Sequence, residues 1–239
     1  MIGRIVWIGI LIALALVTAA AQVDRQARVS PPLATMVPEP FRAFAQARIA
    51  SNAILGDDAE RALAEAERLI ERRPVPAQHM RLLANAQFKA EQVEQSAVTV
   101  QLAARRGWRD ILSQQAMLEL ALAAGDEAEA ARRYAALLLN SRTEDEVLAE
   151  LGTRTFVNPD GEARSTFTEI VRGGERWHEY FLRRGARAIP PEAFTAIVID
   201  AAEQGAQFDC QAIDRTTKML NNRDAAQAER FSAAFAEQC

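Results

Sequence analysis

The residues best suited to acid–base chemistry gather at one point of the chain, in the run Glu175–Tyr180. His178 stands three residues after Glu175 and beside Glu179, and on one helix the i, i+3 spacing brings a carboxylate within reach of the imidazole. General acid–base catalysis requires such a pair. The same run also fits an amphipathic helix that turns Trp177 inward and its charges outward. We favour that structural interpretation, and an enzyme or enzyme accessory subunit with a site around His178 is the alternative.

The other candidates for catalysis or metal binding lack the spacing that their chemistry needs. His79 is the only other histidine and stands in the first turn of an expected helix, and neither histidine belongs to an HExxH pattern. Arg172-Gly173-Gly174 is too short for a phosphate-binding loop and lacks the Lys-Ser/Thr that follows one, so we interpret it as a helix terminator. We therefore predict no catalytic residue, no metal ligand and no cofactor.

The two cysteines, Cys210 and Cys239, are too far apart for a CxxC motif and too few for a Cys-only metal site. An isolated pair in an exported chain is usually oxidised. We expect antiparallel helices over 210–220 and 224–239, which would bring the start of one beside the end of the other. The sequence thus predicts a disulfide between these cysteines. A Cys–His nucleophile formed with His178 is disfavoured, because Cys210 falls on an apolar stripe.

Residues 1–21 form a hydrophobic segment in which Ile5–Ala21 holds 17 residues without a charge, preceded by Arg4. One interpretation is a signal peptide cleaved near Ala21, after a run of small residues. The other, which we favour, is an uncleaved anchor, because this length reaches the lower limit of a membrane span. Arg4 favours a cytoplasmic N-terminus, whereas Arg25 and Arg28 beyond the segment act against that orientation. We predict a single-pass inner-membrane protein with a periplasmic domain, or a periplasmic protein if the segment is cleaved.

The composition predicts an all-α protein. About a fifth of the 239 residues are alanine, whereas glycine, aromatic and β-branched residues are sparse, which favours helix over sheet. The net charge is −4, and basic residues are scattered among acidic ones. Proteins that bind nucleic acid usually carry a basic face, so we expect no nucleic-acid partner.

Breaker residues divide the rest of the chain into successive helices. Residues 22–38 contain three prolines and little periodicity, which is typical of a tether between membrane and domain. Thr143 and Glu146 have the spacing of a capping box, and Asn158–Gly161 predicts a turn. In 39–144 we expect a series of repeated helices. The first runs over 40–55, and the second begins after a capping residue at 57 or 58 and ends at 72. The others run over 77–91, 93–106, 109–124 and 127–139. In 145–239 we expect C-terminal helical hairpins, with helices over 163–172, 176–184, 191–204, 210–220 and 224–239 and Gly185 among the breaks.

Small or apolar residues in the first half recur with a period of 34, at positions where two paired helices must approach closely. Three such columns are Ile49, Leu83, Met117; Ala50, Ala84, Leu118; and Ala62, Ser96, Ala130. At these positions the chain resembles the tetratricopeptide repeat family, which has the same period. Glu91 and Trp108 depart from the family pattern, which places glycine and proline there in the second repeat.

The resemblance implies an α-solenoid of helical hairpins that binds a protein or peptide on its surface. Some tetratricopeptide domains hold a peptide carboxylate with Arg and Asn one turn apart, and Arg81 and Asn85 have that spacing, although Ala116 replaces the matching Asn of the next repeat. Arg81, Asn85 and Phe88 are therefore the candidate partner-binding residues. The expected partner is an unidentified envelope protein or peptide, and the expected role is that of a non-enzymatic scaffold of the bacterial cell envelope.

Overall fold

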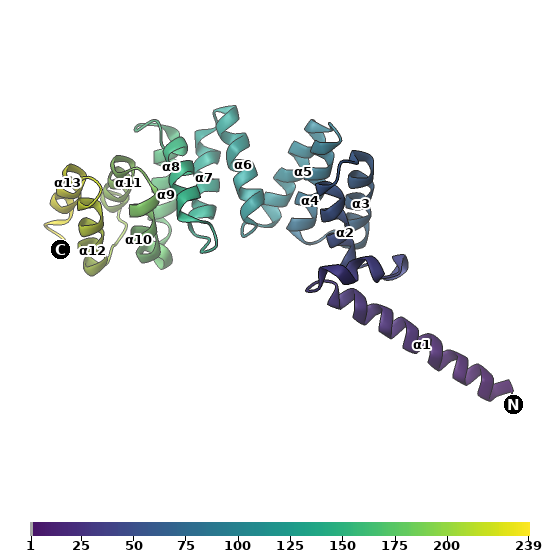
Figure 1. Cartoon of the computed structure of the whole chain (residues 1–239). Coiled ribbons are helices and arrows are strands. Elements are labelled where there is room, and N and C mark those ends of the chain that lie inside the picture. Colours follow the sequence, from purple (N-terminus) through teal and green to yellow (C-terminus); the bar gives the residue numbers. More distant parts are fainter. Residues whose placement is uncertain (1) are drawn as a thin grey trace. The chain divides into compact units, whose positions relative to one another are not determined.

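The computed structural model describes residues 2–239, and every regular element in that range is a helix (Figure 1). This confirms the prediction of an all-α helical array with one apolar N-terminal helix. The bounds in the N-terminal part are α1 Ile2–Gln26, η1 Pro31–Met36, η2 Glu39–Phe41, α2 Ala45–Leu55, α3 Ala59–Arg72, α4 Ala77–Lys89 and α5 Val93–Arg106. The remaining elements are α6 Ile111–Ala124, α7 Glu127–Leu138, α8 Asp145–Thr155, α9 Glu162–Arg172, η3 Glu175–Trp177, α10 His178–Ala188, α11 Pro191–Glu203, α12 Cys210–Asn221 and α13 Ala225–Phe235.

The chain folds into two compact units, the first ending at Gly107 and the second beginning at Trp108, whereas the sequence suggested a division near 144. In the first unit α2 pairs with α3 and α4 pairs with α5, and α2 also packs on α4. In the second unit the helices form two layers, one in which α10 packs between α8 and α12 and another in which α7, α9, α11 and α13 follow one another. We call α2, α4, α6, α10 and α12, each of which packs on the helix that follows it, the first helices of the hairpins.

Local signals fix where most of these helices begin and end. Asp58 and Asp126 accept the backbone N–H groups of residues 61 and 129 and thereby cap α3 and α7. Gly125 ends α6 in the left-handed conformation, with φ +71°. Glu91 takes the same conformation, with φ +62°, although it is not glycine. The same left-handed turn therefore follows α4 and α6, at positions 34 residues apart.

The small-residue column lies at the helix crossings, as predicted. Ala62 in α3 and Ala130 in α7 are fully buried. Between them in the column, Ser96 of α5 donates its hydroxyl to the Ala84 carbonyl oxygen of α4, at 2.8 Å. Each position therefore holds a side chain small enough to let the two helices of a hairpin approach closely.

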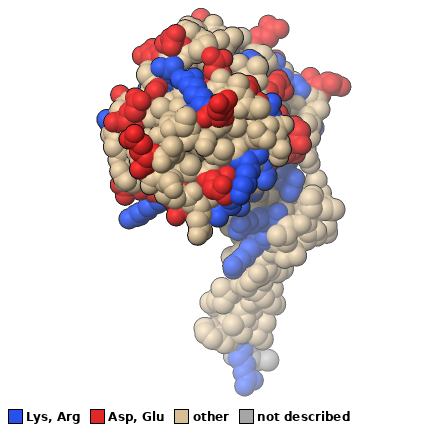
Figure 2. Space-filling model, turned by 90° about the vertical axis from the view of Figure 1, so that its left-hand side faces the viewer, with Lys and Arg blue, Asp and Glu red and all other residues tan. Residues whose placement is uncertain are grey.

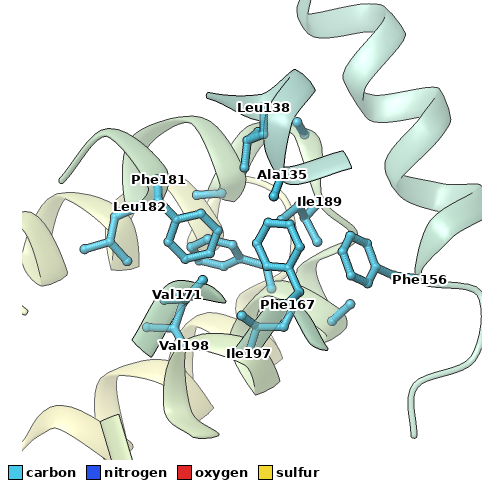
Figure 3. Close-up of a cluster of buried hydrophobic side chains, with 14 of the residues drawn as sticks. Ala135, Leu138, Phe156, Phe167, Val171, Phe181, Leu182, Ile189, Ile197 and Val198 are labelled. Carbon is cyan, nitrogen blue, oxygen red and sulfur yellow. The ribbon is translucent and has the colours of Figure 1, made fainter. Parts of the chain in front are cut away.

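A chain of aromatic rings forms the core of the second unit (Figure 3). Phe167 contacts Phe156 and Phe181 with ring centroids 5.4 and 5.7 Å apart, and Phe181 continues to Phe194 at 5.5 Å. These rings come from four elements along the two layers, so the segment beyond residue 144 shares one core with α6 and α7.

Two local expectations in the second unit were wrong. α10 runs through Gly185, because the missing side chain admits the rings of Phe181 and Phe194, which would lie 2.9 Å from an added Cβ. Thr143 does not cap α8, because its hydroxyl donates to the Leu137 carbonyl oxygen instead, and α8 begins without a side-chain cap. In both places a tertiary contact overrides the local sequence signal.

Residues 22–38 also differ from the expected tether. α1 continues to Gln26, and Ala27, Ala34 and Val37 are buried against the start of α2. The carboxylate of Asp24 accepts the backbone N–H groups of residues 43, 44 and 45 at 2.9–3.0 Å. Because α1 supplies this cap, α2 begins at residue 45 rather than at 40, and the apolar helix is joined to the hairpins by a packed segment.

Candidate functional site

The imidazole of His178 faces backbone carbonyl oxygens on both sides. Its Nε2 lies 2.6 Å from the oxygen of Val171, and its Nδ1 lies 3.0 Å from that of Gln207. The side chain is buried, and Glu179 pairs with Arg215 at 3.0 Å rather than with the ring. Both ring nitrogens thus face backbone groups of neighbouring segments, and the nitrogen that carries the proton donates to one of these oxygens. These contacts differ from the hydrogen-bonded pair of Glu175 and His178 that the sequence allows, because the partners of the imidazole are backbone oxygens.

The two cysteines are joined, as the sequence predicts. Cys210 opens α12, Cys239 follows α13, and their Cα atoms lie 5.4 Å apart in a disulfide. Asp209 caps α12 through the backbone N–H of Ala212, and Asp224 caps α13 through that of Gln227. The bond therefore closes an antiparallel hairpin, and the Cys210 sulfur is not available as a nucleophile.

The candidate residues Arg81, Asn85 and Phe88 all lie on α4, at i, i+4 and i+7. Asn85 is exposed, and Phe88 is 65% exposed, a large share for an aromatic side chain. Arg81 lines a pocket between α2 and α4, but Asn85 and Phe88 do not. The structure therefore places the three side chains along one helix and does not gather them around a single cavity.

The pocket beside Arg81, which we call the α2–α4 pocket, has a volume of about 370 Å³. Its basic residues are Arg28, Arg48, Arg73 and Arg81, and the guanidinium of Arg73 lies 4.1 Å from the ring centroid of Phe44. The remaining lining residues are Ala27, Ala47, Ser51, Gln78, His79 and Leu82, so no carboxylate lines the pocket.

The buried histidine of this pocket, His79, is a structural group rather than a surface residue. Its Nδ1 lies 2.9 Å from the carbonyl oxygen of Arg73, and its side chain is almost completely enclosed. Burial lowers the pKa of the imidazole, and the positive charge of Arg73 lowers it further, while the hydrogen bond to the backbone opposes both. His79 therefore favours its neutral form and joins the end of α3 to the start of α4.

A second hollow, which we call the α10–α12 groove, lies between two first helices of the second unit, with a volume of about 330 Å³. Its floor is apolar and includes Leu182, Ala212 and Met219. Its charged residues are Arg183, Arg187, Arg215, Lys218 and Glu179. Arg215 pairs with Glu179 and Lys218 with Asp214, so Arg183 and Arg187 carry the basic character of the rim. An apolar floor beneath a basic rim suits an amphipathic, acidic segment of another protein.

Sequence reasoning missed both hollows, because each combines residues from helices that are brought together only by packing. Arg183 and Arg187 share one face of α10, yet exposed arginines at i, i+4 are common on solvated helices. The one available signal was the position of Arg28, a basic residue just beyond an apolar span.

α1 exposes its apolar side chains over most of its length, including Trp7, Leu11 and Leu14. In the described range it is the helix that is long and apolar enough to cross a membrane. Figure 2 shows basic side chains at the N-terminal end of α1 and near its C-terminal end, and uncharged residues along the helix between them.

No protein-family model, no curated protein and no solved structure matches this chain. Functional inference therefore starts from the α2–α4 pocket, the α10–α12 groove and the apolar helix α1.

Proposed function

We propose that this protein is a non-enzymatic interaction module of the bacterial cell envelope, anchored in the inner membrane by α1 and facing the periplasm. It binds another envelope protein through the first helices of its tetratricopeptide-like hairpins. The α10–α12 groove is the observation that carries this proposal, since it combines an apolar floor with an open, basic rim. Helical arrays bind peptides and helices on such surfaces.

The length of α1 supports the membrane anchor. Its uncharged stretch extends from Ile5 to Val23, which is 19 residues. At the rise of an α-helix this stretch measures about 28 Å, close to the hydrocarbon thickness of a bilayer. The helix also continues without a break through Ala21 into the residues that pack on α2, which favours the anchor over the cleaved signal peptide.

The disulfide supports a periplasmic location for the body. Disulfides persist in oxidising compartments and are rare in the reducing cytosol. Cys210 at the start of α12 and Cys239 beyond the end of α13 are joined in a disulfide, which suits a domain that folds after export.

The alternative, an enzyme with its site around His178, receives less support from the same contacts. General acid–base catalysis needs an imidazole nitrogen that can reach substrate. Both nitrogens of His178 face backbone carbonyl oxygens inside the second unit. The neighbouring carboxylate of Glu179 lines the α10–α12 groove, which His178 does not, and it is paired with Arg215.

Site-specific photocrosslinking in the native host tests the partner site. A crosslinker placed at Arg183 or Met219, which line the groove, should give one discrete adduct with another envelope protein. A crosslinker at Arg230, an exposed residue of α13 outside the groove, is the control and should give none. Reversing the rim charge with Arg187→Glu and Arg215→Glu should abolish the adduct. No adduct at either groove position, or the same adduct at Arg230, would show that the groove is not the partner site.

Topology is tested separately, with a reporter that is active only in the periplasm, fused after residue 60. Activity supports the proposed orientation, and activity of a cytoplasmic reporter at the same position would reverse it. Mass spectrometry of the mature protein should find α1 retained, whereas a protein that begins at Gln22 would show that the segment is a signal peptide.

A further inference from the structure

The α2–α4 pocket concentrates positive charge, because arginines from several elements line it and no carboxylate does. Arg28, Arg48 and Arg73 line it, and none of these three has a carboxylate within 4.0 Å among the residues that the structure describes. Arg81 contributes a fourth guanidinium to the wall. Guanidinium groups bind phosphate oxygens with paired hydrogen bonds, so a cluster of this kind suits a phosphate group better than a single carboxylate.

Two neighbouring features prepare the pocket for an anion. Arg73 lies against the ring of Phe44, which limits the conformations of its guanidinium. Ser51 and Gln78 add uncharged hydrogen-bond donors to the wall.

The position of Arg28 places this pocket at the level of the lipid headgroups. α1 ends at Gln26, about 4.5 Å beyond the last residue of the uncharged stretch, Val23, at the helical rise, and Arg28 follows two residues later in the turn. The headgroup region on each side of a bilayer is about 5–8 Å deep. If α1 spans the membrane, Arg28 therefore lies among the headgroups while it also lines the pocket.

The pocket is held at this level by the fold. Asp24, one turn before Arg28, accepts three successive backbone N–H groups at the start of α2, and α2 carries Arg48 and Ser51. The buried side chains of Ala27 and Val37 pack beside this contact. Ala27 belongs to this joint and also lines the pocket, as does Phe44, whose N–H Asp24 accepts, so the pocket is built onto the end of α1.

We propose that the α2–α4 pocket binds the phosphate group of an anionic phospholipid in the membrane that α1 crosses. This proposal rests on the proposed anchoring. It gives a role to Arg28, which is unfavourable on the outer side of an inner-membrane span by charge alone. Lipid binding there fixes the height and tilt of the first unit above the membrane.

The test uses the full-length protein in detergent and native mass spectrometry. The probes are short-chain phosphatidylglycerol, short-chain phosphatidylcholine and inorganic phosphate. The wild-type protein should retain phosphatidylglycerol in preference to phosphatidylcholine. The variant Arg48→Gln/Arg73→Gln should retain at least about 10-fold less phosphatidylglycerol, since it loses two phosphate contacts.

Two further variants separate phosphate recognition from net charge and from folding. Arg61→Gln/Arg105→Gln removes the same charge from exposed positions of the same unit outside the pocket, and it should bind phosphatidylglycerol like the wild type. Arg48→Lys/Arg73→Lys keeps the charge and should restore part of the binding. Circular dichroism melting of each variant shows whether it is folded.

Equal retention of the two lipids, or equal phosphatidylglycerol binding by the wild type and the folded Gln variant, would overturn the proposal. If inorganic phosphate displaces phosphatidylglycerol at similar concentrations, the pocket is a site for a free anion. If an acidic peptide binds through Arg48 and Arg73 while phosphatidylglycerol does not, the pocket is a binding site for a protein partner.

The lipid test is independent of the tests of the proposed function. Crosslinking at the α10–α12 groove and the topology reporter do not depend on these arginines, so failure of lipid binding is distinguishable from failure of the proposed function.

Discussion

The carboxylate of Asp24 in α1 accepts the backbone N–H of Ala45, the first residue of α2, at 2.9 Å. Asp24 is almost completely buried and also accepts the N–H groups of residues 43 and 44. A side chain from the apolar helix therefore caps the first helix of the array. This contact makes the connection between α1 and the hairpins a structural joint.

Replacing Asp24 should destabilise the first unit. Asp24→Ala leaves buried N–H groups without an acceptor, at a cost of about 1–3 kcal/mol, and Asp24→Asn should cost less because the amide oxygen still accepts. The measurement is thermal unfolding of the full-length protein in detergent, followed by circular dichroism. Asp57→Ala is the control, because Asp57 is exposed and Asp58 caps α3. Equal melting temperatures for Asp24→Ala and Asp57→Ala would show that the cap adds nothing to stability.

The hairpins could be predicted from the sequence because their signals are local. Asp58, Asp126 and Gly125 mark helix ends within a few residues, and the column of Ala62 and Ala130 repeats at a fixed period. The disulfide followed from the expected antiparallel arrangement of two neighbouring helices. Each of these features depends on contacts within one hairpin.

The contacts between hairpins could not be predicted in the same way. Asp24 reaches a helix that begins 21 residues later, and no sequence pattern identifies a cap supplied from such a distance. The partner of His178 Nδ1 is a carbonyl oxygen 29 residues away, and the expected partner was a neighbouring carboxylate. Gly185 was taken for a break because its close approach to Phe194 is visible only in the packed core.

Adding a side chain at Gly185 should destabilise the second unit. In Gly185→Ala the new Cβ would lie 2.9 Å from the buried rings of Phe181 and Phe194, so the rings must shift, at a cost of about 1–3 kcal/mol. Gly173→Ala is the matched control, because its Cβ would meet two carbonyl oxygens at 3.7 and 4.0 Å, which are ordinary contacts. Urea unfolding curves of both variants provide the comparison. The interpretation fails if Gly185→Ala is as stable as Gly173→Ala.

Removing the disulfide should destabilise the hairpin of α12 and α13. The bond joins residues separated by 29 positions, and a loop of this length corresponds to about 3–4 kcal/mol in the chain-entropy description. Cys210→Ser, Cys239→Ser and the double variant should therefore lose similar stability, because each breaks the same bond. Thiol titration of oxidised, denatured protein should find no free thiol before reduction and two afterwards. Two free thiols before reduction, in protein taken from the periplasm, would contradict both the bond and the proposed location.

The neutral imidazole of His79 should make the first unit sensitive to acid. Burial lowers the pKa of His79 in the folded protein below its ordinary value of about 6.5, which the unfolded chain retains. As the pH falls below that value, the unfolded chain takes up a proton that the folded protein resists. This contribution to the free energy of unfolding is therefore present above about pH 6.5 and is lost on acidification.

His79→Asn can still donate to the Arg73 carbonyl oxygen but cannot titrate. The loss of melting temperature between about pH 7.5 and pH 5.5 should therefore be smaller in this variant than in the wild type. Gln78→Ala changes the neighbouring residue without removing a titrating group and should keep the full dependence on pH. The same dependence in His79→Asn and in the wild type would mean that this histidine does not control the acid response.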